Sequence, residues 1–330
     1  TPPPPPRPPR LNCRRQRQMC IRDRPIVLAI SDRVTVLRRG KVVASMDTDQ
    51  ATEKSLAMEM VGREVIFRIE KTAVQAGEII LQVEDLSALS DKGLMALNGV
   101  SFDIKEGEIF GVAGIAGNGQ QELVEVLAGL RASESGKVKL DEKDITHASS
   151  LKRWEIGVGY IPADRIHLGS IADFSLIENT AMNYFFDPDY LQRGALNYDK
   201  LRELTEEMIK KYDVATPSPE TTAKSLSGGN LQKVILARVL SRKPRLVIAH
   251  LPTQGLDVGA TEFVRNQLIE AQKEKAGVLL ISEDLDEVLS LSDRVAPIYE
   301  GKFMDIIPGN QAKRESVGAM CAGIILEGDA

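Results

Sequence analysis

The stretch GVAGIAGNGQQELVEVL, residues 111–127, decides the fold. An apolar segment is followed by closely spaced glycines and then by a helical pattern, which is the order of a strand, a glycine-rich turn and a helix. Such a turn lets the backbone approach a phosphate at the amino-terminal end of a helix. Gln120 and Gln121, however, stand where a phosphate-binding loop carries a lysine and a hydroxyl. Taken alone, the segment is either a phosphate loop that has lost its charge or a glycine turn that never bound a nucleotide.

Apolar patterns on both sides of this turn predict an α/β fold. Strands are expected in LNGVSFDI (97–104) and EIFGVAG (108–114), and further strands at Ile79–Glu84, Ile156–Ile161, Arg245–Ala249 and Val278–Ile281. Helices are expected from near Gly119, at Leu201–Lys211 and after Ser227, with Pro244 marking the end of the last one. The first helix is predicted to bury one face, formed by Leu123, Val126, Leu127 and Leu130. The region from about 165 to 225 is expected to form a helical lobe.

The composition is that of a globular protein with one large or two ordinary domains. The 330 residues are 43% hydrophobic and 27% charged, with a formal net charge of -5. The only dense basic run lies in the first 24 residues, so nucleic acid is not an expected partner. No apolar run approaches the roughly 20 residues of a membrane-spanning helix, and a membrane role is expected to run through a partner subunit. Cys13, Cys20 and Cys321 have neither a metal-ligand spacing nor a disulfide framework, which favours a reducing, cytoplasmic setting.

The chain contains an internal repeat. VLAISDRVTVLRRGKVV (27–43) aligns with VLSLSDRVAPIYEGKFM (288–304) at an offset of 261. The same offset relates QATEKSLAMEMVG (50–62) to QAKRESVGAMCAG (311–323). Residues 25–65 are therefore predicted to be the carboxyl-terminal tail of an upstream domain, homologous to the one that ends near 323. The chain is expected to be the back half of a tandem pair, cut at its front end.

The repeat also predicts the domain boundaries. Residues 66–78 are expected to link the two copies, and residues 79–325 to form the second domain. Residues 1–24 are rich in proline and arginine and lack apolar periodicity. Their second half, RQRQMCIRDR, resembles translated sequencing-adapter read-through, so we interpret 1–24 as a non-native segment; the alternative is a natural basic, polyproline-type tail.

Two ordered motifs carry a resemblance to a known family. LSGGNLQK (226–233) is followed, after a predicted helix and strand, by PTQGLDVGA (252–260). In this order and spacing they are similar to the signature motif and the D-loop of ABC-type ATPases. With the GxAGNGQ turn and YIPADR (160–165), the resemblance covers about residues 79–323 and is greatest to the second half of tandem ATP-binding subunits of ribose-type and nucleoside-type importers. It implies an ABC-type P-loop ATPase domain, with a mixed sheet core and a helical subdomain.

The resemblance assigns residues to two half-sites, because in ABC ATPases the signature of one domain closes over nucleotide held by the phosphate loop of the other. The signature half is assigned to Ser227, Gly228, Gly229, Asn230 and Gln232, and the D-loop to Asp257. A serine and two glycines at a helix amino terminus offer a hydroxyl and bare N–H groups to a terminal phosphate; an ordinary serine cap and a surface turn are the alternatives. The loop of the domain's own half-site is assigned to Gly114, Gly117, Asn118, Gly119, Gln120 and Gln121.

The own half-site departs from the family pattern wherever chemistry is required. Gln120 can donate a hydrogen bond but cannot neutralise phosphate oxygens as a lysine does. The Mg²⁺-binding aspartate and the catalytic base fall on His250 and Leu251, the switch histidine on Glu283, and the metal-sensing glutamine on Ala163. No aromatic residue stands in LSALSDKGLMAL (86–97), where adenine normally stacks. This half-site is predicted not to hydrolyse ATP, and no catalytic residue or metal ligand is assigned within it.

Three local features invite an additional functional interpretation. At the end of a buried strand, His250 is more often a structural histidine than a metal ligand. The acidic run in ISEDLDE (281–287) favours a helix amino terminus over an acid/base site. Asp164 and Arg165 either report nucleotide state to a membrane subunit or pair locally.

The leading hypothesis is the ATP-binding subunit of an ABC importer for nucleosides or sugars, on the cytoplasmic face of the cell membrane. Its expected cofactors are ATP and Mg²⁺, bound mainly at the site that the upstream domain completes. Its expected partners are that upstream domain, the membrane permease subunits and, indirectly, an extracytoplasmic solute-binding protein. The chain by itself is expected to be nearly inactive. The alternatives are a nucleotide-sensing ABC domain that never hydrolyses ATP and, disfavoured by the lack of basic patches, an ABC protein that acts on ribosomes or DNA.

Overall fold

The computed structural model describes residues 28–38, 40–61, 76–192 and 194–324. The chain divides into a small unit, Thr1–Val65 with Gly255–Gly259, and a large unit, Ile66–Gln254 with Ala260–Ala330. The predicted non-native segment 1–24 lies outside the described residues, as do residues 66–75 of the predicted linker 66–78. Each unit has a hydrophobic core of its own.

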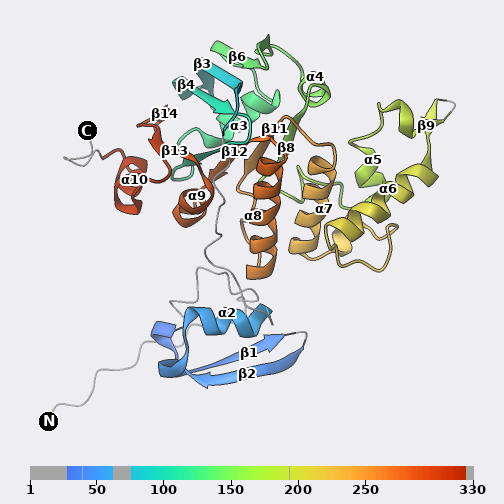
Figure 1. Ribbon diagram of the computed structural model, residues 1–330, viewed down its shortest axis with the longest axis vertical. Coiled ribbons are helices and arrows are strands. Elements are labelled where there is room, and N and C mark those ends of the chain that lie inside the picture. Colours follow the sequence, from blue (N-terminus) through green and yellow to red (C-terminus); the bar gives the residue numbers. More distant parts are fainter. Residues whose placement is uncertain (1–27, 39, 62–75, 193, 325–330) are drawn as a thin grey trace. The chain divides into compact units, whose positions relative to one another are not determined.

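The small unit is a β-hairpin packed against a helix (Figure 1). β1 (Arg33–Arg38) pairs antiparallel with β2 (Lys41–Asp47), and Gly40 turns the chain between them with a φ of 75°. A 3-10 turn, Thr48–Gln50, leads into α2 (Glu53–Val61). Because side chains alternate along a strand, Val34 and Val36 point to one face of β1, where they form a core with Leu56 of α2.

The carboxyl-terminal part of the large unit repeats this arrangement. β13 (Arg294–Tyr299) pairs antiparallel with β14 (Lys302–Phe303) and with β15 (Ile307–Pro308), and α10 (Arg314–Cys321) follows. The Leu37–Val42 strand pair of the small unit corresponds to Ile298–Phe303 here, and Gly301, with a φ of 74°, takes the place of Gly40. The two segments thus share strand register as well as sequence.

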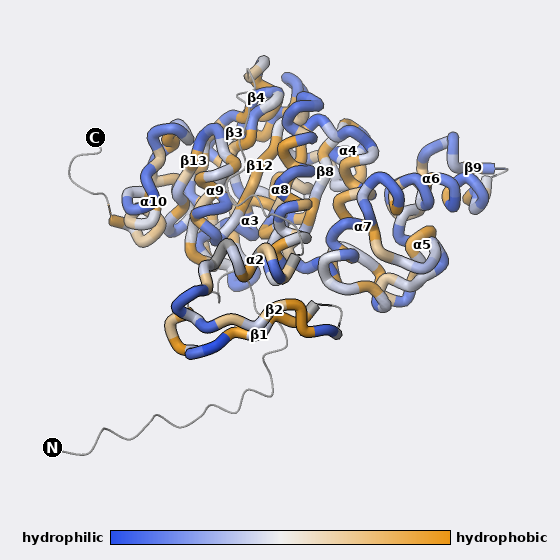
Figure 2. The backbone as a smooth tube through the Cα atoms, turned by 60° about the horizontal axis from the view of Figure 1, so that its bottom comes forward, coloured by the Kyte–Doolittle hydropathy of each residue, from blue (hydrophilic) through white to orange (hydrophobic). Residues whose placement is uncertain are grey.

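A largely parallel sheet forms the centre of the large unit (Figure 1). Its strands run in the order β14-β13-β5-β12-β11-β8, and β15 pairs with β13. β5, β12, β11 and β8 span Ile109–Ala113, Gly277–Ser282, Leu246–His250 and Val158–Ile161. The four strands predicted here are confirmed, with ends that differ by at most two residues. β5 and β12 are buried along their whole length, which explains their continuous apolar sequence and the orange colour of β12 in Figure 2.

A second, antiparallel sheet covers the glycine-rich turn and its helix. It has the order β4-β3-β6-β7, with bounds Met95–Lys105, Ile79–Leu89, Ser135–Leu140 and Lys143–Asp144. α3 (Gln120–Ala128) contacts strands of both sheets and buries Leu123, Val126 and Leu127 as predicted. The prediction for Leu130 is wrong, since this side chain is 57% exposed. The helix ends before it, because Gly129 adopts a left-handed conformation with a φ of 74°.

The remaining helices flank the parallel sheet or form a lobe beside it. α7 (Gly228–Leu240) and α8 (Val258–Lys273) run side by side in Figure 1, and Lys233 of α7 lies 4.8 Å from the ring centre of Phe263 in α8. α9 (Leu285–Leu291) packs on β5 and α10. Among the described residues, no helix is long and apolar enough to cross a membrane.

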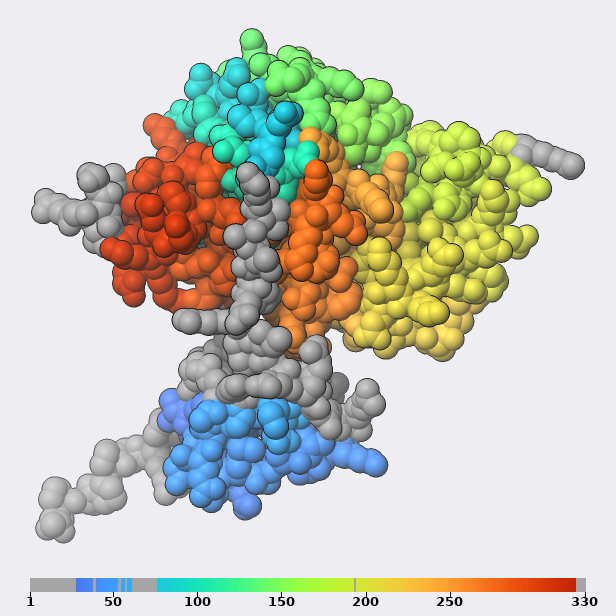
Figure 3. Space-filling view, viewed as in Figure 1, coloured from blue at the N-terminus to red at the C-terminus, as the bar shows by residue number. Residues whose placement is uncertain are grey.

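The predicted helical lobe is present and contains short helices and a small hairpin (yellow in Figure 3). α5 (Leu176–Ala181) begins with a capping box between Ser175 and Glu178, and packs on α6 (Tyr198–Lys211). Between them lie the 3-10 turn Pro188–Tyr190 and the strands β9 (Leu191–Gln192) and β10 (Ala195–Leu196). The 3-10 turn Ala223–Ser225 leads out of the lobe into α7.

A buried arginine links α3 to the segment that precedes α4 (Ser150–Glu155). The guanidinium of Arg153 donates hydrogen bonds to the carbonyls of Val126 and Leu127 at 2.7 and 2.9 Å, and to those of Ile145 and Thr146 at 2.7 and 2.9 Å. The last carbonyls of a helix lack partners within the helix. Arg153 therefore caps the carboxyl end of α3, the helix that positions the glycine-rich turn.

We predict that Arg153→Met lowers the free energy of unfolding by about 3 kcal/mol, because it removes the charged donor that four buried backbone carbonyls share. Arg202→Met is the matched control, since Arg202 forms a surface ion pair with Glu220, and its loss should cost less than about 0.5 kcal/mol. Urea denaturation followed by circular dichroism measures both. Equal losses for the two variants would contradict this role of Arg153.

Candidate functional site

The candidate site lies at the edge of the parallel sheet where four strands end together. β8, β11, β12 and β5 are parallel neighbours, with Ile161 opposite Ala249, His250 opposite Ile281, and Ser282 opposite Ala113. The residues that follow these strands therefore meet at one edge. This places the glycine-rich turn beside the other predicted positions of the own half-site, which are Ala163, His250, Leu251 and Glu283.

The glycine-rich turn has the backbone shape of a phosphate loop. Gly117 and Gly119 have φ values of 90° and 99°, and Gly119 directly precedes α3. Such values strain any residue with a side chain. A Cβ atom at Gly119 would also lie 2.4 Å from the carbonyl oxygen of Ala96. Gly119 is thus required by its tight passage beside β4 and Gly117 by its backbone angle, whether or not a ligand binds.

The side chain of Gln120 occupies the inside of the turn. It is only 6% exposed, its Oε1 accepts a hydrogen bond from the Asn118 N–H at 3.0 Å, and its Nε2 donates to the Ile115 carbonyl at 2.9 Å. The same Nε2 would lie 2.6 Å from a Cβ at Gly114. The carboxamide thus consumes a backbone donor of the loop and fills its interior. An incoming phosphate would have to displace these hydrogen bonds without gaining a cation in return.

The neighbouring polar side chains of the loop are also engaged. Gln121 Nε2 donates to Glu125 Oε1 at 2.8 Å along α3, and Arg131 Nε donates to Oε2 of the same carboxylate at 2.8 Å. Asn118 ties the loop to the turn after β13, because its Oδ1 accepts from the Glu300 N–H at 2.9 Å. The side chains of Asn118 and Gln121, both predicted to bind nucleotide, stabilise the loop itself.

His250 and Leu251 supply neither a charge nor a carboxylate. Burial lowers the pKa of His250 to about 4, and the nearby Glu125 opposes this shift only in part, so the imidazole is neutral near pH 7. The Leu251 N–H donates to the Ile281 carbonyl at 2.8 Å, with the leucine at a φ of 46°. An aliphatic side chain cannot bind Mg²⁺ or activate water.

The other two own-site positions are equally poor partners for a metal ion. Ala163 has no polar atom in its side chain, and Glu283 is exposed just after β12. Mg²⁺ prefers several oxygen ligands, usually carboxylates, phosphates and waters. Gln121 is hydrogen-bonded to Glu125, and a neutral His250 stands where the metal-binding aspartate is expected. The residues of this half-site therefore do not fit a bound Mg²⁺.

The signature residues form the amino-terminal end of α7. Ser227 caps the helix, and its Oγ accepts from the Asn230 N–H at 3.4 Å and from Asn230 Nδ2 at 3.0 Å. Ser227 is exposed, and Gly228 and Gly229 provide the first helical N–H groups, which have no partner within the helix. The predicted serine cap is confirmed.

One member of the predicted signature set has a structural role. Gln232 is 2% exposed, and its Nε2 donates to the Pro252 carbonyl at 2.9 Å. The assignment of Gln232 to the signature stays a prediction, and its buried side chain gives it a packing role within that motif. Gln232 joins α7 to the loop after β11.

Arg165 connects the signature to the loop that precedes the D-loop. Its Nη1 donates to the Gln254 carbonyl at 2.8 Å, and its guanidinium lies 3.3 Å from the position of a Cβ at Gly228. Asp164, in contrast, accepts from the backbone of Ile166 and His167, which is the local pairing considered as one alternative. Asp257 lies immediately before α8.

One carboxylate of the acidic run is buried near this edge, which the sequence pattern did not predict. ISEDLDE does begin a helix, with Asp284 as the cap of α9, but Glu287 is fully buried. It accepts hydrogen bonds from Ser282 Oγ at 2.7 Å, Thr253 Oγ1 at 3.0 Å and Arg265 Nε at 3.2 Å. Its position in the first turn of an acidic helix gave no signal that distinguishes it from its exposed neighbours.

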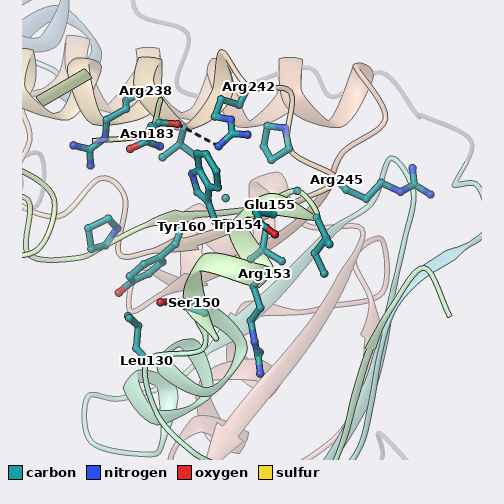
Figure 4. Close-up of a pocket in the computed structure, with 18 of the residues that line it drawn as sticks. Leu130, Ser150, Arg153, Trp154, Glu155, Tyr160, Asn183, Arg238, Arg242 and Arg245 are labelled. Atoms are coloured by element: carbon teal, nitrogen blue, oxygen red, sulfur yellow. Dashed lines mark hydrogen bonds between the residues drawn. The ribbon is translucent and has the colours of Figure 1, made fainter. Parts of the chain in front are cut away.

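A pocket of about 470 Å³ lies beside β8 and the loop that follows it, which contains Ala163 (Figure 4). Pro162 and Leu168, which come before and after Ala163 in that loop, both line the pocket. The Arg242 guanidinium stacks on the Trp154 ring at 3.3 Å from its centre, and its Nη1 donates to the Asn183 carbonyl at 3.3 Å. Lys243, Arg245 and Glu155 also line the pocket, and Arg245 is ion-paired with Glu106 and Asp141. The pocket contains none of the residues assigned to either half-site.

The sheet order, the turn before α3, the helical lobe and the serine-capped α7 define an ABC-type ATPase domain. Residues 97–254 match the family model described as ABC transporter. The chain therefore contains an ABC transporter ATP-binding domain.

Curated relatives are ATP-binding proteins of importers. The chain is 42% identical over 299 residues to the glucose import ATP-binding protein TsgD13 of Haloferax volcanii, covering 90% of this chain and 54% of that protein. It is 40% identical over 297 residues to the nucleoside import ATP-binding protein NupA of Lactococcus lactis, covering 90% and 59%. The chain thus spans little more than half the length of these relatives.

Solved structures show the same fold. A dimeric bacterial ABC transporter cassette superposes with a TM-score of 0.60 and 21% identity, covering 69% of this chain and 98% of that one. An ABC transporter cassette in its ADP conformation gives a TM-score of 0.58 and 20% identity, covering 74% and 95%.

We predict that His250 makes the stability of the protein fall in acid. The unfolded chain protonates this imidazole near its ordinary pKa of about 6.5, whereas the folded protein resists protonation down to about pH 4. The contribution of the neutral imidazole to the free energy of unfolding is therefore complete above about pH 6.5, and it is lost as the pH falls towards 4. Urea denaturation at pH 7 and at pH 4 measures how much the free energy of unfolding falls between these two values. This fall should be larger by about 2 kcal/mol in the wild type than in His250→Gln. Identical pH profiles would show that His250 is not held neutral.

Proposed function

We propose that this chain forms part of the ATP-binding subunit of an ABC importer for nucleosides or sugars, and that its two half-sites have different roles. The complete half is the signature, which serves nucleotide bound by another ATP-binding domain. The degenerate half is the domain's own loop, which does not hydrolyse ATP. The names of the import proteins among its relatives support the transport assignment.

The observation that carries the proposal is the hydrogen-bonded Gln120 carboxamide inside the loop. It accompanies a neutral His250, an aliphatic Leu251 and a side chain at Ala163 without polar atoms. Any one of these features could coexist with a working site. Together they leave the loop without a phosphate cation, a metal ligand and a base, so hydrolysis here would lack the charged groups that usually stabilise it.

The signature half has retained what it needs. The O–H group of Ser227 can donate a hydrogen bond while its oxygen accepts from Asn230. The N–H groups of Gly228 and Gly229 lie at the positive end of the α7 dipole, which favours a terminal phosphate. In this proposal ATP and Mg²⁺ are held by the loop of an upstream domain, and Ser227 completes that site.

The repeat supports an upstream domain of the same polypeptide. Residues 25–65 would be its carboxyl-terminal tail, and residues 79–325 the second ATP-binding domain. The support is the shared register of β1–β2 and β13–β14–β15, together with the corresponding turns at Gly40 and Gly301.

The pocket beside Trp154 is a suitable place for a membrane permease subunit, and the protein would act on the cytoplasmic face of the membrane. Pro162 and Leu168 line the pocket, while Arg165 between them contacts the Gln254 carbonyl and lies beside Gly228. A permease segment in the pocket would thus press on a loop that touches the signature. A solute-binding protein would take part only through the permease.

A nucleotide-sensing domain without turnover is the second candidate. It is favoured by the same degenerate half-site, and it differs in predicting that no partner domain restores hydrolysis. The two candidates are separated by the turnover of a paired protein.

We predict that Ser227→Arg abolishes Mg-ATP turnover in a chimera. In this chimera the amino-terminal ATP-binding domain of a tandem relative is followed by this chain from Leu28 onwards. The bulky cation blocks the signature from the partner's nucleotide, and turnover should fall at least about 100-fold. Ser149→Arg is the matched control, because Ser149 is an exposed serine cap of α4. A phosphate-release assay measures the rates. Turnover that survives Ser227→Arg would refute the cross-domain role, and an inactive chimera would favour the sensing domain.

A further inference from the structure

The hairpin of the small unit has an apolar face on the side opposite its core. Val34 and Val36 point towards Leu56, so Thr35 and Leu37 point the other way. Val42 is paired with Leu37 and shares its face. Leu37 is 66% exposed and Val42 62% exposed. We call Thr35, Leu37 and Val42 the open face.

The equivalent residues of the large unit are buried in its main core. At the offset of 261, Leu37 corresponds to Ile298, which is 0% exposed, and Thr35 corresponds to Ala296, also 0% exposed. Phe303, the equivalent of Val42, packs against the same core. The two copies of one motif thus differ in whether this face is covered.

In the large unit the edge of β13 is occupied as well, by a parallel strand of the same sheet. β13 pairs with β5 from Arg294 opposite Phe110 to Pro297 opposite Ala113. Among the described residues, β1, the equivalent of β13, pairs with β2 alone. The open face therefore adjoins a strand edge whose counterpart is occupied.

A charged residue marks the same edge. Arg294 donates to Asp103 Oδ2 at 3.0 Å and to Glu108 Oε2 at 3.1 Å, and Glu108 directly precedes β5. Its equivalent, Arg33, lies 3.7 Å from Asp47, with both side chains about two-thirds exposed. Arg33 is thus placed to meet an acidic residue at the start of an added strand.

We propose that the open face binds the sheet core of an upstream ABC ATP-binding domain, which adds a parallel apolar strand to β1 and places a carboxylate beside Arg33. This inference rests on the proposed function, in which the repeat indicates an upstream ATP-binding domain. It identifies the occupant by three matched features, which are the strand edge, the apolar face and the cation at one end.

A binding experiment tests the open face. The full chain is co-expressed with a tagged fragment of the Lactococcus lactis nucleoside import relative. This fragment ends just before the residue that is equivalent to Arg33. Copurification and affinity are then measured. We expect binding that Leu37→Asp with Val42→Asp weakens at least about tenfold. Both side chains are exposed, so hydrogen exchange should find the hairpin itself unchanged in the variant.

The control is Lys41→Asp with Met58→Asp, two exposed positions outside the open face, which should bind like the wild type. Failure of the wild type to bind, or equal binding by the open-face variant, would overturn the proposal. A homodimer of the chain that the open-face variant dissociates would also overturn it, by assigning the face to a second copy. Because the assay needs no turnover, binding without Ser227-dependent hydrolysis would refute the proposed function alone.

Discussion

Parallel pairing of β8, β11, β12 and β5 brings the ends of four strands to one edge of the large unit. The positions of Ala163, Leu251, Glu283 and the glycine-rich turn follow from this pairing, and not from the chemistry of their side chains. The sheet can therefore keep the geometry of a nucleotide site after the reactive groups are gone. Buried strands such as β5 and β12 hold this edge in place.

The glycine-rich turn is stable without a ligand because Gln120 satisfies it from within. A lysine would leave a charge that favours phosphate, whereas the neutral carboxamide closes the loop by bonding to Asn118 and Ile115. The signature end of α7 differs in this respect, since Ser227 is exposed and the first N–H groups of the helix face no helical acceptor. We propose that one domain thus gives up catalysis at its own loop and keeps the part that acts on a partner.

Periodicity and motif order in the sequence predict the α/β class, the strands and the serine cap at Ser227. They misplace Leu130, because the end of α3 depends on the left-handed Gly129 and on Arg153, whose carbonyl partners come from distant segments. Gln232 could not be separated from its neighbours, since its burial against Pro252 depends on tertiary packing. The sequence likewise predicts that Gln120 removes a positive charge from the loop. Only the structure shows that its side chain fills the inside of the loop.

The central claim is our proposal that the loop of this domain lacks the cation and the metal ligand that tight Mg-ATP binding and hydrolysis require. Titration of the isolated chain with Mg-ATP, followed by calorimetry, tests it most directly. We predict a dissociation constant weaker than about 1 mM, unchanged by removal of Mg²⁺. Saturable binding in the low micromolar range that requires Mg²⁺ and is altered by Gln120→Ala would contradict the claim.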